Sequence, residues 1–280
     1  MGSRPADPLG CTSSNNPTRR PGAIESPGTV VDVDGGMSPA PDGSALVVGG
    51  ASGIGAAVVD AQRALGHPVT VWDIAGDPDV ECDIADPAAI DRAVRATVEA
   101  AGIPRWVTVT AGVGRGGMLL DEPADAFDTV MAVNARGSWL VLRALARSMI
   151  DAGVSGSMVA TSSVSAHLVD RGMGVYCASK AALSMIVRVA AFEWAPHGIR
   201  VNAVGPGVTR TPMLGRAPVD SGWLAAVQGR TPLGRLGDSV DIAESVVALH
   251  GMSWVTGQIV DCDGGLSLHS PIDSFGGGDG

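Results

Sequence analysis

Residues 45–55 read ALVVGGASGIG, and this stretch decides the fold. The apolar run at 45–48 has the composition of a buried strand, and residues 54–65 have helical spacing and end at Gly66. The glycines between them let the backbone turn sharply and approach a phosphate closely, and the start of the helix offers free N–H groups to an anion. In this context the segment predicts a site for the pyrophosphate of a dinucleotide. A purely structural turn is the alternative, because the chain holds 39 glycines.

Outward from this segment, strand-like and helix-like stretches alternate. Further strands are expected at residues 69–72, 107–110, 157–161, 200–204 and 257–261, and helices at 87–101, 124–152 (broken near 134–137) and 175–195. The alternation predicts a single α/β domain with a Rossmann-like, doubly wound parallel sheet in a three-layer αβα arrangement. Such sheets bind ligands beyond the carboxyl ends of their strands. Residues 74–82 are too few and too broken for a crossover helix, so one helix is expected to be missing there.

The two ends of the chain differ from its middle. Residues 1–43 are rich in Pro, Gly, Ser and Asp and predict a flexible N-terminal extension, with one short strand near 29–33. Residues 270–280 predict a flexible tail, which leaves an ordered domain at 44–269. Within it, residues 210–237 carry apolar side chains among glycines and predict a mobile lid over the substrate. An ordinary exposed loop with a short helix is the alternative.

The composition narrows the classes of partner. Lys and Arg number 19 and Asp and Glu 29, and the net charge of −10 disfavours nucleic acid or an anionic membrane as partner. Uncharged apolar runs stay far below the ~18 residues of a membrane span, and the N-terminus lacks a signal pattern, so a cytoplasmic protein is expected. Four scattered cysteines and five dispersed histidines indicate neither a disulfide framework nor a metal site.

A carboxylate follows the second expected strand. Asp73 stands 18 residues after Gly55, where it can accept hydrogen bonds from both ribose hydroxyls and repel a 2′-phosphate. The glycine loop and the residues just after Asp73 contain no arginine, so we expect NAD rather than NADP. An ordinary strand-end aspartate is the alternative. Asp83 and Ile84 are expected at the next strand end, beside the adenine edge.

The chain contains one tyrosine, Tyr176, and one lysine, Lys180, and the two stand four residues apart. On a helix these positions share a face. A phenol has a pKa of about 10, too high for a base at neutral pH. A neighbouring ammonium favours the phenolate and lowers that pKa, and the positive nicotinamide of an oxidised dinucleotide adds to the effect. If the chain held other tyrosines and lysines, a surface tyrosine and a solvated lysine would be the better interpretation of this pair.

Together, the glycine segment, Asp73 and the Tyr176-x-x-x-Lys180 pair resemble the short-chain dehydrogenase/reductase family in its single-domain form, over about residues 44–268. The resemblance implies that Ser163 hydrogen-bonds the substrate oxygen, with Ser162 as the fallback, and that Asn134 holds a water in a proton relay. Tyr176 is then the catalytic acid and base. Lys180 assists it and also binds the nicotinamide ribose.

The resemblance also implies which residues contact ligands and how the chain assembles. Cofactor contacts are expected from Gly49, Ser52, Gly53, Ile54, Asp73, Asp83, Ile84, Ala111, Gly112, Tyr176, Lys180, Pro206, Gly207, Thr209 and Thr211. Substrate contacts are expected from Ser163, Tyr176, Met213 and Trp223. A homotetramer is expected, with a homodimer as the alternative.

Three positions depart from the family pattern. Val48 stands where the family has threonine, and Thr209 where it has valine or isoleucine. The Asn-Asn-Ala-Gly segment of the family reads Val109-Thr110-Ala111-Gly112, so a hydrogen bond of the first asparagines must be rebuilt here. None of these positions is Ser163, Tyr176 or Lys180, so activity is still expected.

The function expected from these residues is hydride transfer between NAD(H) and a secondary alcohol or ketone. No arginine cluster is evident for a CoA, a carrier protein or a phosphorylated substrate, which favours a neutral, apolar alcohol or ketone. The short 74–82 stretch resembles that of some bacterial hydroxysteroid dehydrogenases, and this resemblance implies a hydroxysteroid-like substrate. A carrier-linked 3-oxoacyl reductase and a non-catalytic NAD-binding sensor are the alternatives. His167 could touch substrate or be a loop histidine, and Cys177 is interpreted as packing.

Overall fold

The structure, a computed structural model, describes residues 43–215 and 220–268. Seven parallel strands form its main sheet in the order β3-β2-β1-β4-β5-β6-β9. Their bounds are β1 Ala45–Val48, β2 Val69–Asp73, β3 Val80–Glu81, β4 Trp106–Val109, β5 Gly156–Thr161, β6 Ile199–Pro206 and β9 Ile259–Cys262. The strand order reverses at β1, which lies between β2 and β4, and this confirms the doubly wound parallel sheet.

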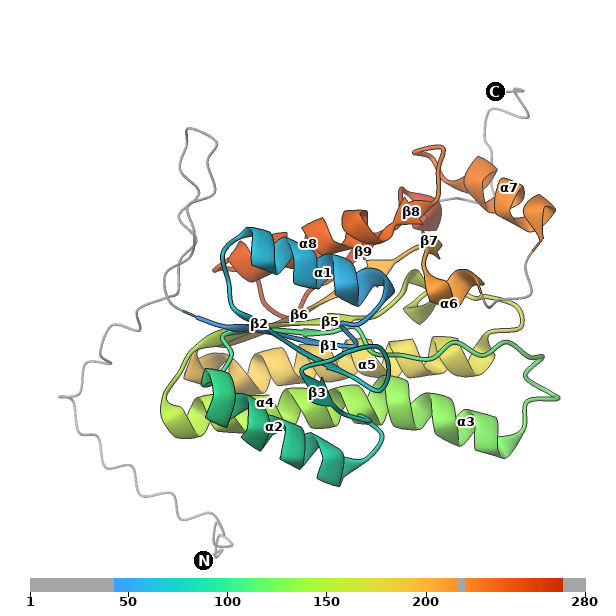
Figure 1. The fold of residues 1–280 in the computed structure, drawn as a ribbon. Coiled ribbons are helices and arrows are strands. Elements are labelled where there is room, and N and C mark those ends of the chain that lie inside the picture. Colours follow the sequence, from blue (N-terminus) through green and yellow to red (C-terminus); the bar gives the residue numbers. More distant parts are fainter. Residues whose placement is uncertain (1–42, 216–219, 269–280) are drawn as a thin grey trace, which may run out of the picture.

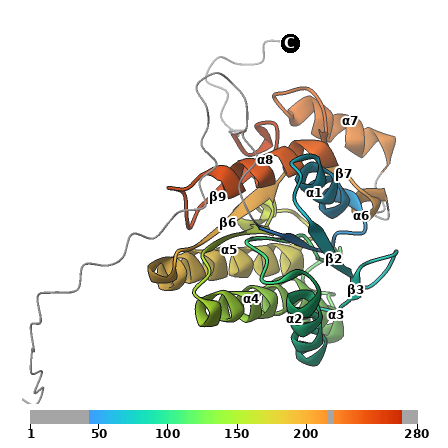
Figure 2. The same cartoon turned by 60° about the vertical axis from the view of Figure 1, so that its left-hand side comes forward.

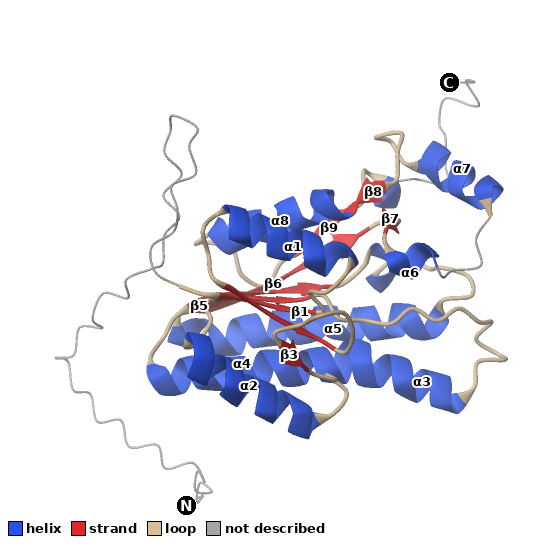
Figure 3. Ribbon diagram, in the orientation of Figure 1, coloured by secondary structure: helices blue, strands red, loops and turns tan. Residues whose placement is uncertain are grey.

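Helices cover both faces of the sheet (Figure 1, Figure 3). On one face lie α1 (Gly53–Ala64) and α8 (Ser239–Gly251); on the other lie α2 (Pro87–Ala101), α4 (Ser138–Ala152) and α5 (Gly174–Trp194). Helix α3 (Ala124–Met131) runs through a π-helical turn, Ala132–Gly137, into α4. Figure 2 shows the same three layers from a second direction. The three-layer αβα prediction is confirmed.

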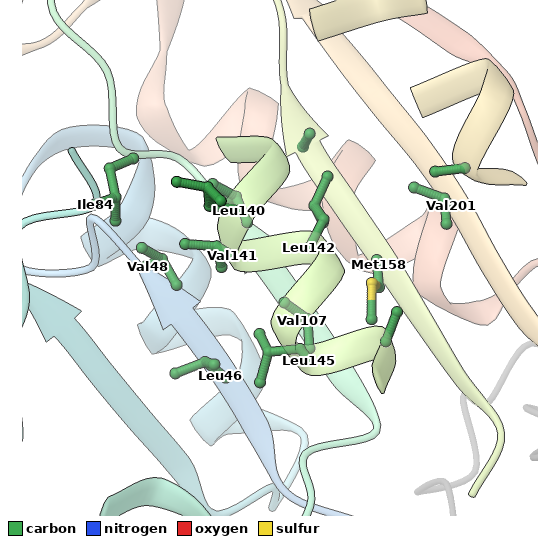
Figure 4. Close-up of a cluster of buried hydrophobic side chains, with 14 of the residues drawn as sticks. Leu46, Val48, Ile84, Val107, Leu140, Val141, Leu142, Leu145, Met158 and Val201 are labelled. Carbon is green, nitrogen blue, oxygen red and sulfur yellow. The ribbon is translucent and has the colours of Figure 1, made fainter. Parts of the chain in front are cut away.

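Each face of the sheet has its own hydrophobic core. The cluster below the sheet joins Leu46, Val107 and Met158 of the strands to Leu142 and Leu145 of α4, all fully buried (Figure 4). The cluster on the other face joins Val47, Val159 and Val204 to helices α1 and α8. Burying each such side chain stabilises the fold by about 1.5–3 kcal/mol. The strands are buried on both faces, as their continuous apolar runs predict.

The predicted elements agree with the structure in kind and nearly in bounds. Helix α2 begins where Asp86 accepts a hydrogen bond from the N–H of Ala88 at 2.9 Å, with Pro87 in the first turn. The expected break near 134–137 is the π-helical turn. Residues 74–79, all described, connect β2 to the parallel strand β3 without a helix, as predicted. The predicted N-terminal extension, its strand at 29–33 and the tail fall almost entirely outside the described residues.

Several elements were not predicted. Helix α8 begins with a capping box, in which the N–H of Asp238 donates to the carboxylate of Asp241 at 2.7 Å. Strands β7 (Thr209–Arg210) and β8 (Gly237–Asp238) pair with each other and bracket the predicted lid. Between them lie the short helix α6 (Pro212–Gly215) and α7 (Ser221–Arg230). The Asp-x-x-Asp pattern at 238–241 was the available indication of α8.

Helix α5 with its continuation, Gly174–His197, is long and apolar enough to cross a membrane by length and composition alone. The sequence analysis did not anticipate this. In the fold the helix packs against β6, α3 and α4 and contributes Leu183, Val187 and Ala191 to the core. This packing explains the apolar residues on the buried face of the helix.

Candidate active site

The glycine loop between β1 and α1 leaves no room for side chains. Gly49 has φ of +82°, and a Cβ there would lie 2.5 Å from the backbone nitrogen of Ala111. A Cβ on Gly55 would lie 2.0 Å from the carbonyl oxygen of Gly49. Both positions therefore require glycine. Thr110 supplies a hydrogen bond in place of the family's asparagine. Its hydroxyl shares one hydrogen between the carbonyl oxygens of Val48 and Gly49, at 2.9 and 3.0 Å.

The N-terminus of α1 fits an anionic group. Ser52 is the N-cap but makes no side-chain capping bond, and the first turn holds no acidic residue. The free N–H groups and the positive end of the helix dipole thus face the loop. Across the loop, Thr211 lies about 3.5 Å from the place a Cβ on Gly53 would take. The residues Gly49, Ser52, Gly53 and Ile54 fit the pyrophosphate of a dinucleotide.

Asp73 lies beside this loop at the end of β2. One carboxylate oxygen accepts the N–H of Ala51 at 2.9 Å, and the other accepts the N–H of Ile74 at 2.7 Å. Each oxygen keeps a further lone pair for a ribose hydroxyl. The structure places Asp73 where the sequence analysis expected it, next to the phosphate loop.

The other expected cofactor residues are divided between surface and core. Asp83 is exposed after β3 and accepts the N–H of Ala85, whereas the side chain of Ile84 is buried against the π-helical turn. On the far side, Pro206 ends β6 and Gly207 follows, where a Cβ would lie 2.8 Å from Asp263. Thr209 is buried and donates to the carbonyl of Gly207 at 3.0 Å. Its hydroxyl hydrogen is therefore used within the protein.

Tyr176 and Lys180 meet on one face of α5, as their spacing predicts. The Nζ of Lys180 lies 5.7 Å from the centroid of the Tyr176 ring and donates to the carbonyl oxygen of Thr161 at 2.8 Å. Lys180 is 3% exposed, and burial lowers its pKa to about 8. A Cβ on Gly112 would lie 3.5 Å from Nζ, so the segment Ala111–Gly112 also adjoins this group.

The lowered pKa expected for the phenol of Tyr176 is not found when only groups of the protein surround it. Burial raises the pKa of Tyr176, and the charge of Asp170 adds to the increase, while the hydrogen bond with Ser163 lowers it. The sequence analysis expected Lys180 to lower this pKa. Desolvation of the half-buried Tyr176 is the largest contribution instead, and Lys180 is not among the groups that lower this pKa.

The structure separates the two candidate serines. Ser163 lies close enough to Tyr176 to lower the pKa of its phenol, and it stands at the start of the 3-10 turn Val164–Ala166. The hydroxyl of Ser162 points instead toward α5, where it donates to the carbonyl of Lys180 at 3.2 Å and pairs with the hydroxyl of Ser184 at 2.8 Å. Of the two serines, Ser163 is the neighbour of Tyr176, whereas the hydroxyl of Ser162 is bonded to α5.

Asn134 is completely buried in the π-helical turn. Its amide nitrogen donates to the carbonyl of Val113 at 2.9 Å and to the hydroxyl of Ser179 at 3.0 Å, and its amide oxygen accepts the N–H of Val113 at 2.8 Å. The side chain therefore joins the loop after β4 to α5. A role in holding a water stays a prediction, and the side chain has little capacity left for it.

The expected substrate residues are only partly brought together. Met213 of α6 faces the loop after β4, with its sulfur 3.4 Å from the place of a Cβ on Gly114. Met173 and Leu119 lie in similar contact with Gly116 and Gly174, so apolar side chains flank the loop after β4 and the start of α5, the helix that carries Tyr176. Trp223 lies on α7, 41% exposed, and no contact joins it to these residues.

Sequence reasoning missed four polar residues of the site. Ser179 joins Asn134 to the carbonyl of Tyr176, and Thr161 accepts from Lys180. Ser165 and Asp170 extend the hydrogen bonding of Ser163 away from Tyr176. A separate observation concerns His167, which the sequence left open between a substrate contact and a loop histidine; it pairs with Asp261 at 3.1 Å. The short serine-rich segment 162–165 was the only indication in the sequence.

A separate, open hollow of about 520 Å³ lies on the opposite side of α5 from the sheet. It is lined by Asp128, Met131, Ala132, Ala135, Arg136, Trp139, Ala182 and Ile186. None of these residues belongs to the catalytic set, so we assign the hollow no part in the site.

The site can now be compared with known proteins. A family model described as Enoyl-(Acyl carrier protein) reductase matches residues 49–267. The 2,5-dichloro-2,5-cyclohexadiene-1,4-diol dehydrogenase LinX of Sphingobium indicum is 31% identical over 242 residues, which cover 80% of this chain and 96% of that protein. The (3R)-3-hydroxyacyl-CoA dehydrogenase of Canis lupus familiaris is 33% identical over 80% of this chain and 96% of its own.

Solved structures agree with these matches. The aldohexose dehydrogenase of Thermoplasma acidophilum in ligand-free form superposes with a TM-score of 0.78, at 25% identity, over 85% of this chain and 99% of its own. A short-chain type dehydrogenase/reductase from Mycobacterium marinum superposes with a TM-score of 0.76, at 29% identity, over 80% and 95% of the two chains.

Proposed function

The chain belongs to the short-chain dehydrogenase/reductase family, and from that premise we propose that it transfers a hydride between NAD(H) and a neutral, largely apolar secondary alcohol or ketone. Its relatives are oxidoreductases of CH–OH groups that use a nicotinamide cofactor, and the chain is of the same class. The observation that carries the proposal is the gathering of Ser163, Tyr176 and Lys180 at one end of β5, beside the glycine loop.

In the proposed reaction, NAD held by the glycine loop and Asp73 would supply the acceptor for the hydride of the carbinol carbon. Tyr176, as the phenolate, takes the hydroxyl proton of the alcohol onto Oη and returns it in the reverse direction. Ser163 donates a hydrogen bond to the oxygen as negative charge develops there. Lys180 holds a positive charge close to the Tyr176 ring, but burial alone raises the phenol pKa. An oxidised nicotinamide, when bound, would supply the further positive charge that favours the phenolate.

NAD is favoured over NADP by the charge at the end of β2. The carboxylate of Asp73 lies beside the phosphate loop, where a 2′-phosphate would meet like charge. We expect turnover with NAD and little with NADP. In Asp73→Ala, the ratio of kcat/KM with NAD to kcat/KM with NADP should be smaller than in the wild type. The measurement is kcat/KM with each cofactor. A wild-type preference for NADP would contradict this part of the proposal.

The apolar approach to Tyr176 supports the proposed substrate class. Met173, Leu119 and Met213 lie against the loop after β4 and the start of α5, the helix that carries Tyr176, and methionine side chains adapt to irregular apolar ligands. The test is a panel of cyclic and open-chain secondary alcohols with NAD, followed by the absorbance of the reduced nicotinamide. Sugars and diols belong in the panel, because relatives include a glucose 1-dehydrogenase of Gluconobacter oxydans and the diol dehydrogenase. Faster turnover of sugars than of apolar alcohols would contradict the substrate class.

A reductase of acyl thioesters is the second candidate. It is favoured by the description of the matching family model and by the hydroxyacyl-CoA relative. Reduction of an acetoacetyl thioester in preference to simple ketones would select it. A chain that binds NAD but turns over no member of either panel would be a sensor instead.

We also propose that the chain assembles as a homotetramer through α3, α4 and α5. Large apolar side chains are exposed on these helices, among them Trp139, Met185, Val189 and Phe192. The hollow described above joins the three helices into one surface. Contiguous exposed apolar surface of this kind marks contacts between proteins. Light scattering should give four copies for the wild type and fewer for Trp139→Glu.

A further inference from the structure

The hydroxyl of Ser163 is one end of a short chain of hydrogen bonds. Ser163 Oγ accepts the N–H of Ser165 at 3.1 Å and donates its hydrogen to Ser165 Oγ at 3.1 Å. Ser165 Oγ in turn donates to the Oδ2 of Asp170 at 2.5 Å. Ser163 and Ser165 are both 7% exposed, whereas Asp170 is exposed. The chain thus runs from the site to the surface.

Its direction follows from counting hydrogens. A serine hydroxyl has one hydrogen to donate, and an ionised carboxylate can only accept. Since Asp170 takes the hydrogen of Ser165 in a short, charge-assisted bond, Ser165 Oγ can only accept from Ser163. Ser163 Oγ is therefore held by two contacts from one residue, the N–H and the hydroxyl of Ser165.

These contacts fix the oxygen of Ser163 but not its hydrogen. A hydroxyl hydrogen turns about the Cβ–Oγ bond without moving the oxygen. When Ser163 turns its hydrogen to a substrate oxygen, the hydroxyl of Ser165 can turn from Asp170 and donate to Ser163 Oγ, beside the N–H of the same residue. Catalytic groups held in place before substrate arrives avoid the cost of ordering them during the reaction. We propose that Ser165 and Asp170 are positioning residues, which hold Ser163 Oγ where it can bind the oxygen of the substrate.

The side chains are not needed to build the turn itself. Backbone bonds already close it, from Ala166 to the carbonyl of Ser163 at 3.0 Å and from Met173 to the carbonyl of Asp170 at 3.0 Å. The hydroxyl of Ser165 and the carboxylate of Asp170 can therefore be removed with the turn kept. This separates a positioning role from a structural one.

The inference rests on the proposed function, and its test compares Ser165→Ala in two backgrounds. In the wild type, we expect kcat to fall about tenfold, the effect of losing one hydrogen bond of about 1.4 kcal/mol, with the Kd for NAD unchanged. In Ser163→Ala, the same substitution should change kcat less than about twofold, because Ser165 acts through Ser163. Ser165→Thr, which keeps the hydroxyl, should recover most of the wild-type kcat.

Asp170→Ala should lower kcat in the same way, and Arg171→Ala, at the exposed neighbouring position, should leave it unchanged. Ser148→Ala on α4 is the matched serine control. Thermal unfolding identifies any variant that has lost its fold. Equal losses for Ser165→Ala in both backgrounds, or wild-type kcat in Ser165→Ala, would overturn the inference alone. Absence of wild-type turnover would overturn the proposed function, and this inference with it.

Discussion

The two ends of strand β5 each carry a buried cluster of polar side chains, and the clusters differ in how completely they are paired. At the amino end, Ser157 Oγ pairs with His250 Nδ1 at 3.1 Å, and His250 Nε2 pairs with Thr108 Oγ1 at 3.0 Å. Arg200 donates to the carbonyl of His250 at 2.7 Å and to two further carbonyls. Both ring nitrogens of His250 thus have protein partners.

At the carboxyl end the pairing is incomplete. Within residues 43–215 and 220–268, Lys180 uses one of its three hydrogens, in the bond to the carbonyl of Thr161. The buried hydroxyl of Thr161 has no partner in the same part of the chain. Buried polar groups are normally paired, and exceptions concentrate where a protein binds or reacts. We infer from the difference that the amino-end cluster supports the fold and that Lys180, at the carboxyl end, keeps hydrogens for a ligand.

The largest effect that would test this contrast is on Tyr176. Tyr176→Phe removes the one oxygen that can carry the proton, and we expect kcat to fall by about 10²–10⁴-fold. The Kd for NAD and the thermal unfolding midpoint should stay close to the wild-type values. Steady-state kinetics, NAD titration by fluorescence and a thermal melt measure the three quantities. Retained turnover would refute the acid–base role.

A substitution in the amino-end cluster should lower the stability of the protein and leave its kcat unchanged. His250→Leu leaves the hydroxyls of Thr108 and Ser157 without their partner, and we expect a loss of about 2–4 kcal/mol in the free energy of unfolding. The kcat of the folded fraction should be unchanged. His197→Leu, at an exposed position, is the control and should unfold like the wild type. A lower kcat in folded His250→Leu would contradict the inference that the amino-end cluster supports only the fold.

The amino-end cluster also predicts a pH dependence of stability. Burial, with the charges of Arg200 and His67, lowers the pKa of His250 from 6.5 to about 3. Between these values the unfolded chain binds a proton that the folded chain does not, so stability falls as the pH is lowered through this range. The slope from this residue is about 1.4 kcal/mol per pH unit, and it vanishes above pH 6.5.

Urea unfolding at several pH values measures this slope. His250→Leu should lack it while keeping the acid sensitivity due to carboxylates such as Asp241, whose pKa Arg235 lowers to about 2. Equal slopes for the wild type and His250→Leu would show that His250 is not held neutral in the folded protein.

The same contrast explains what the sequence predicts and what it does not. The glycine loop, the alternation of strands and helices and the Tyr176–Lys180 face follow from local patterns, namely turn chemistry, apolar runs and helical spacing. The break at 134–137 was likewise visible. Helix α8 was missed because its capping box consists of two aspartates in a loop-like segment, and its apolar face is identified only by the sheet it covers.

The hydrogen bonds within the two clusters were not predictable. Ser157 and His250 are 93 residues apart in the chain and Thr108 and His250 are 142 apart, so no spacing rule connects them. The sign of the Tyr176 pKa shift was also beyond sequence reasoning. Spacing places a charge near the ring, but the extent of burial decides which effect dominates.

The smallest predicted effect lies at the carboxyl end, in Thr161. Thr161→Val keeps the shape of the side chain and the carbonyl that accepts from Lys180, but removes the hydroxyl without a partner among the described residues. If that hydroxyl serves no ligand, its removal relieves a buried unpaired group, and we expect stability to rise by up to about 1 kcal/mol with kcat unchanged. Urea unfolding and steady-state kinetics measure both. A fall in kcat at unchanged or greater stability would instead show that Thr161 Oγ1 takes part in the reaction. The polar groups left unpaired for a ligand would then include this hydroxyl as well as Lys180.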